Sequence, residues 1–106
     1  MARLAAARVI NTTFQINAAR PAFAAYRVRI LGVGAADIGQ IALLSDKASP
    51  PTTVIALIRS PILAAGEIFD TMIYALVQPG DNVRLDASNI AGAPTQSIQG
   101  QAETVI

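Results

Sequence analysis

The 106-residue chain contains no cysteine and no histidine. Nucleophilic triads of the Ser-His-Asp or Cys-His type and zinc sites built from Cys and His each need one of these side chains. The group that titrates near neutral pH in most acid–base mechanisms is also absent. The sequence therefore predicts a protein that is not an enzyme, with no catalytic residue, no metal and no cofactor. It also predicts no disulfide framework.

Charged residues are scarce as well, at 14% of the chain against roughly 25% in an ordinary soluble domain. Eight basic and seven acidic residues leave a net charge of +1, so no nucleic-acid partner is expected. No apolar run approaches the ~20 residues of a membrane-spanning helix, and no membrane partner is expected either. Seven of the eight cations are Arg, a bias typical of protein interfaces that a GC-rich genome also produces.

The carboxylates are not spaced for chemistry. Asp81 and Asp86 stand at the two ends of a predicted strand, about 16 Å apart, whereas glycoside hydrolases need a pair within about 5 to 10 Å. Ser45 and Lys47 have the spacing of a Ser/Lys dyad but lie in a proline-rich loop, where solvated turn residues are expected. A calcium site remains an alternative only if the fold gathers the loop acids Asp37, Asp46, Glu67 and Asp70.

What the chain does contain is a series of strand patterns. The clearest is 24–33, "AAYRVRILGV", in which Tyr26, Val28 and Ile30 point to one face while Arg27 and Arg29 point to the other. Loops rich in Ser, Asn, Gly or Pro are expected at 45–51, 60–69 and 88–94, the second with at most one helical turn. Further strands are expected at 8–16, 40–44, 53–58, 70–78, 82–87 and 95–106.

The strongest local turn signal is Gln78-Pro79-Gly80-Asp81, because Pro sets φ for the second position of a type II turn and Gly accepts positive φ at the third. We expect a hairpin there. The sum predicts an all-β fold, an antiparallel sandwich or jelly-roll-like barrel of about six to seven strands. One domain spans 1–106, with residues 1–8 as an N-terminal arm that is either flexible or a single turn ordered only against a partner.

Three of the expected strands, 40–44, 53–58 and 72–77, are apolar on both faces, whereas a two-layer sandwich normally leaves one face of each sheet in water. Either loops cover the second face or another subunit does. The shortage of charge favours another subunit. We select Tyr26, Arg27, Arg29 and Arg59, with the terminal arms, as the candidate contact residues.

Two segments, "IALLSDKASPPTTVIALIRSP" at 41–61 and "YALVQPGDNVRLDAS" at 74–88, resemble small all-β structural proteins of tailed bacteriophages. The likeness lies in a strand that ends near Ser-Asp, a Pro-Thr-Thr loop, and a strand-turn-strand built on Pro-Gly. It implies a virion component of the capsid decoration, fibre or tail type, assembled in the bacterial host cytoplasm. It also implies a symmetric homo-oligomer, such as a trimer, with a major capsid or tail protein as partner. No functional residue is carried over by the resemblance.

Two functions follow. The first is a non-enzymatic structural subunit of a bacteriophage particle that acts through symmetric protein–protein contacts. The second is a small β-sandwich module that binds a glycan or a host-surface receptor, which requires an exposed aromatic platform.

Overall fold

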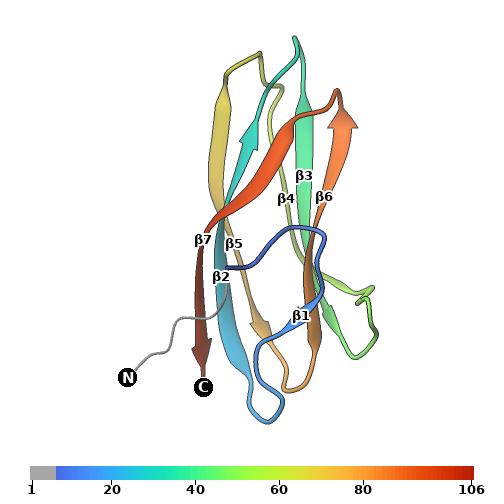
Figure 1. Cartoon of the computed structure of the whole chain (residues 1–106), viewed down its shortest axis with the longest axis vertical. Helices are drawn as coiled ribbons and strands as arrows, with labels where there is room; N and C mark the ends of the chain where they lie inside the picture. The colour runs from blue at the N-terminus through green and yellow to red at the C-terminus, as the bar shows by residue number, and fades with distance from the viewer. Residues whose placement is uncertain (1–6) are drawn as a thin grey trace.

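The computed structural model describes residues 7–106, which form two antiparallel sheets packed face to face (Figure 1). One sheet has the strand order β1-β6-β3-β4 and the other has the order β5-β2-β7. No helix occurs in this part of the chain, and hence none that is long and apolar enough to cross a membrane. The predicted antiparallel sandwich is confirmed. Its strands are β1 Phe14–Gln15, β2 Ala22–Leu31, β3 Ile38–Asp46, β4 Val54–Arg59, β5 Ile68–Val77, β6 Asn82–Ala91 and β7 Thr95–Val105.

The core lies between the sheets and follows the alternation of the strands. Tyr26, Val28 and Ile30 of β2 are fully buried, as the period-2 pattern predicts. They pack with Ile73 and Val77 of β5 in their own sheet. The other sheet contributes the buried side chains Ile41, Leu43, Val83 and Leu85.

The turn at 78–81 forms as predicted, but the hairpin does not. The Asp81 amide donates to the Gln78 carbonyl at 3.2 Å, and Gly80 has a φ of +74°. However, β5 pairs with β2 while β6 pairs with β3 and β1, so the turn crosses from one sheet to the other. The local turn geometry is the same in both cases, and the packing of each strand's buried face decides which sheet it joins.

The first and sixth strands also differ from expectation. β1 has two residues where 8–16 was expected, because Asn11 adopts a positive φ of 59°. The Asn11 amide donates to the Leu85 carbonyl at 2.7 Å, and the Asn11 side-chain oxygen accepts from the Ala87 amide at 3.0 Å. The loop expected at 88–94 begins only after Ala91, because pairing with β3 overrides the weak strand propensity of the residues before it.

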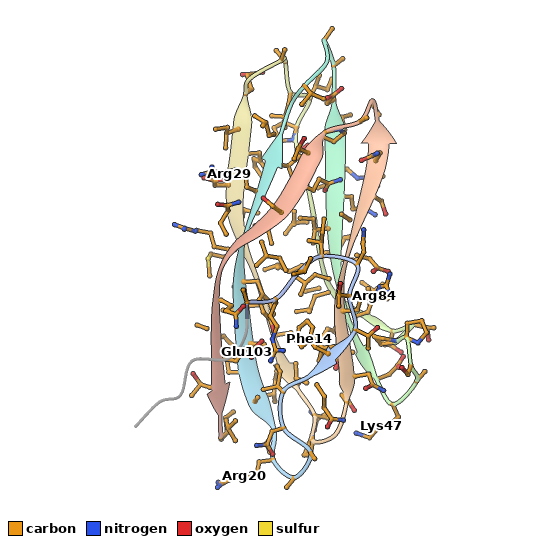
Figure 2. All side chains as sticks on the ribbon, viewed as in Figure 1. Phe14, Arg20, Arg29, Lys47, Arg84 and Glu103 are labelled. Carbon is orange, nitrogen blue, oxygen red and sulfur yellow. The ribbon has the colours of Figure 1, made fainter. Side chains whose placement is uncertain are left out.

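The N-terminal segment is fastened across one side of the sandwich. Most of the arm expected at 1–8 lies outside the described residues, but Arg8 is not part of a free arm. Its guanidinium pairs with Glu103 of β7 at 2.8 and 2.9 Å and lies 4.2 Å from the centre of the Phe14 ring. Figure 1 shows the segment before β1 crossing in front of the two sheets, and Figure 2 places Glu103 and Phe14 beside it.

Candidate interaction surface

The outer face of the β5-β2-β7 sheet carries a cluster of exposed large apolar side chains, here called the outer apolar face. Because strand residues alternate, the burial of Ile73 and Val77 turns their neighbours on β5 toward solvent. Exposure within the cluster ranges from 43% for Phe23 to 60% for Tyr74. Its members are Phe23 of β2 and Ile68, Met72, Tyr74 and Leu76 of β5.

Strand register concentrates these side chains along the β5 edge. Phe23 pairs with Leu76, and its ring lies 6.1 Å from that of Tyr74 in a tilted arrangement. On the other side of β2, the β7 positions opposite Phe23, Ala25 and Arg27 are small: Thr104, Ala102 and Gly100. The outer apolar face is therefore bulky at β5 and flattens toward β7.

Two of the predicted contact residues, Arg27 and Arg29, stand on this face, as the alternation of β2 predicts. Arg29 forms a two-pronged ion pair with Asp70 of β5 at 2.8 and 3.0 Å. The hydrogen bonds of this pair raise the pKa of Arg29 and lower the pKa of Asp70. Among the residues that the structure describes, Arg27 makes only a 3.5 Å contact with the Gln99 carbonyl, so its charge remains available on the surface. In Figure 2 the Arg29 side chain points away from the sandwich.

The other two predicted contact residues lie elsewhere. Tyr26 is fully buried, and its hydroxyl donates to Glu103 at 2.7 Å. Its selection as a surface contact is wrong, because the strand parity that exposes Arg27 turns Tyr26 into the core. Arg59 is exposed on β4 of the opposite sheet, where it donates to the Gln40 side chain at 2.7 and 3.0 Å. The four residues do not form one site.

The aromatic part of this surface, Phe23 and Tyr74, was not predicted from the sequence. Phe23 shares its parity on β2 with Arg27 and Arg29, and Tyr74 is opposite in parity to the buried Ile73. That parity was a usable signal. It was hidden because aromatic side chains are commonly core residues in a chain with so few of them.

A second group of exposed apolar residues lies on β4, the edge strand of the β1-β6-β3-β4 sheet. β4 contacts β5 of the opposite sheet. These residues are Val54, Ile55 and Leu57. The prediction that 53–58 and 72–77 carry apolar groups on both faces is confirmed. Loops within the described residues do not cover them, since the outward side chains stay exposed.

Ser45 and Lys47 both contact the carboxylate of Asp81, and these contacts hold neighbouring segments of the chain together. The Ser45 hydroxyl donates to one oxygen of Asp81 at 3.1 Å. The Lys47 ammonium pairs with the other oxygen and also donates to the Pro79 carbonyl. These contacts tie the end of β3 and the loop after it to the turn that joins β5 and β6. The expectation of a solvated turn residue is wrong for Ser45, which lies in β3 and is buried.

The acidic residues Asp46 and Asp37 each accept hydrogen bonds within their own loop and do not share a site. Asp46 accepts from the backbone amides of Thr52, Thr53 and Ala48, and these bonds, that of Thr52 first, hold its pKa below the ordinary range. The Asp37 carboxylate accepts from two amides in the loop that precedes β3. Over residues 7–106 no three acidic side chains come together in a way that could hold a metal ion.

Comparison of the chain with protein-family models, with curated proteins and with solved structures gives no match.

Proposed function

We propose that this protein is a non-enzymatic structural subunit that assembles in symmetric copies by burying its apolar strand surfaces. The observation that carries the proposal is the outer apolar face. Contiguous exposed apolar patches rimmed by polar residues are uncommon on monomeric proteins and mark interaction surfaces. Here the patch holds two aromatic rings and a Met, which are enriched in interface cores, beside Arg27 and an ion pair.

The setting we propose is a bacteriophage particle, with a major capsid or tail protein as the second partner. This part of the proposal comes from the resemblance of segments 41–61 and 74–88. A small subunit held through many symmetric contacts needs only a modest area in each, because linked copies bind with a high effective concentration.

Sedimentation velocity of the purified full chain in the micromolar range tests the proposal. We expect oligomers for the wild type. The double substitution Tyr74→Ser and Leu76→Ser should weaken association at least about ten-fold, since central interface anchors each contribute more than about 1 kcal/mol. The matched control is Val33→Ser, which removes an equally exposed apolar side chain from a loop outside the outer apolar face. A wild type that stays monomeric across the range contradicts self-assembly.

A second candidate, glycan or host-receptor binding, is favoured by one observation, the adjacent exposed rings of Phe23 and Tyr74. Sugar rings stack on such faces, but they also need polar groups to fix their hydroxyls. On β2 and β5 the strand partners of the two rings, Ala25 and Leu76, supply none, and on β7 the residue opposite Phe23, Thr104, supplies a single hydroxyl. A glycan array probed with the wild type and with Tyr74→Ala tests this candidate, and an array without hits removes it.

A further inference from the structure

The two sides of the sandwich are protected very differently against pairing with other strands. On one side β1 has only two residues, β7 is broken by a bulge opposite Arg27 and Val28, and the N-terminal segment lies across both sheets. Short edge strands, bulges and covering segments are the devices that keep sheet edges from associating. The other side is formed by β4 and β5.

Over residues 7–106, β5 has none of these devices. It is ten residues long, pairs with β2 without a register break, and contains no Pro, Lys or Arg. Its one charged residue, Asp70, is already neutralised by Arg29. Within the described residues β5 pairs only with β2, so its other edge presents unpaired backbone groups. A long, regular and apolar edge of this kind is a template for strand addition.

We propose that β5 pairs antiparallel with β5 of a second copy, about a two-fold axis at Met72, to form a continuous six-stranded sheet. The inference rests on the proposed function and specifies the geometry of self-association. In the paired sheet the outer apolar faces of the two copies join into one band. That band is then available to the shell or tail partner.

The occupant is a second copy because the strand is self-complementary. A two-fold axis perpendicular to a sheet generates an antiparallel pair with the same surface on both subunits. With the axis at Met72, outer residues face outer residues: Ile68 faces Leu76, and Met72 faces itself. The single charge, Asp70, then faces the Tyr74 phenol, which can donate to a carboxylate. A shift of the axis to Ile73 places Asp70 opposite Leu76 instead, which leaves a carboxylate against an aliphatic side chain.

The available area also fits a second copy. Ten residues of β5 at ~3.3 Å each give a side about 33 Å long, and two sheets about 10 Å apart with their outward side chains give about 20 Å of depth. The product, roughly 660 Å², approaches the roughly 800 Å² per partner of a standard interface. The same axis brings together the two β4 strands, with their exposed Val54, Ile55 and Leu57.

The absence of cysteine allows a direct positional test. In the full chain, Met72→Cys places two thiols directly opposite each other, at the Cα separation of about 4.5 to 5.5 Å that a disulfide accepts. We expect mild oxidation to give a disulfide dimer on a non-reducing gel. Val33→Cys is the control, because Val33 is as exposed as Met72, at 53% against 47%, yet it lies in a loop outside β5 and outside the outer apolar face.

A charge substitution provides a second readout. Met72→Lys opposes two ammonium groups across the axis and should weaken the dimer at least about ten-fold in sedimentation experiments. Val33→Lys adds the same charge in a loop away from the axis and should leave the dimer intact, while circular dichroism checks that each variant is folded. A dimer that survives Met72→Lys, or thiols at 33 that cross-link as well as those at 72, overturns the β5 pairing but not the proposed function. A monomeric wild type overturns both.

Discussion

Single residues hold the ends of this sandwich, and Asp37 is the clearest case. It is buried, its carboxylate accepts from the amides of Val33 and Gly34, and its backbone exchanges two hydrogen bonds with Leu63. Gly92, after β6, packs directly against it. A Cβ at Gly92 would lie 1.9 Å from the Asp37 carboxylate oxygen, and the φ of this residue is +66°.

This contact predicts a difference between two glycines. Gly92→Ala combines a left-handed backbone with a steric overlap, whereas Gly66→Ala has a φ of +84° but no atom within 4 Å of the new Cβ. We expect Gly66→Ala to cost about 1 to 2 kcal/mol of unfolding free energy, the penalty of the backbone alone. Gly92→Ala should cost at least about 2 kcal/mol more, because the buried carboxylate must move. Urea denaturation measures both, and equal losses contradict the packing at Asp37.

At the scale of elements, the ion pair between Arg8 and Glu103 attaches the N-terminal segment to β7. Burial alone would raise the pKa of this carboxyl, but hydrogen bonds from Arg8 and Tyr26 outweigh it and hold the pKa below its ordinary value of 4.5. The same environment, burial first and then the bond to Glu103, raises the pKa of the Tyr26 hydroxyl. The Arg8–Glu103 ion pair is largely buried. Removing one partner therefore lowers the free energy of unfolding, since it leaves the other partner buried without its counter-charge.

Because the pKa of Glu103 is lowered in the folded state, the contribution of this carboxyl to stability depends on pH. A carboxyl whose pKa is lower in the folded state stabilises the fold above its unfolded-state pKa and loses that contribution as pH falls through the folded-state pKa. At neutral pH, Glu103→Gln should cost about 3 kcal/mol of unfolding free energy. The difference in unfolding free energy between the variant and the wild type should become smaller below pH 4.5, the ordinary pKa of Glu. Denaturant titrations of both proteins from neutral to acidic pH measure the difference, and a constant gap refutes the linkage.

For the whole molecule, low charge and exposed apolar surface act together. Eight cations and seven anions leave little net repulsion between copies. Several of these charges are also paired within the chain, as in Arg8–Glu103 and Arg29–Asp70. In the proposed assembly, association is therefore driven by apolar burial and backbone pairing, with a small electrostatic component.

This balance predicts how association responds to conditions. The dissociation constant should change less than about three-fold between low and high salt, because screening acts mainly on charges. Association should carry a negative heat-capacity change and weaken on cooling, as burial of apolar surface does. Sedimentation equilibrium across salt and temperature measures both quantities. A steep loss of affinity with salt would assign the contacts to ion pairs instead.

The fold was largely predictable, while the surface was predictable only in part. Alternation along β2 identified Tyr26, Val28 and Ile30 as one face and the two Arg as the other, because side-chain direction in a strand is a local property. Whether a given face meets the core or solvent is not local. Tyr26 was therefore assigned to a contact surface although it is buried, and the exposed pair of Phe23 and Tyr74 was not identified.

Most of the strands, the turn at 78–81 and the shortage of charge and of titratable groups were predictable from the amino-acid sequence, since these follow from composition and from contacts between near neighbours in the chain. Three features became visible only in the folded chain: β5 and β6 join different sheets, Arg8 pairs with Glu103, and within residues 7–106 β5 is an open edge. Strand partners are chosen by side chains far apart in the sequence, which must bury one another's apolar faces, and no local pattern records that choice.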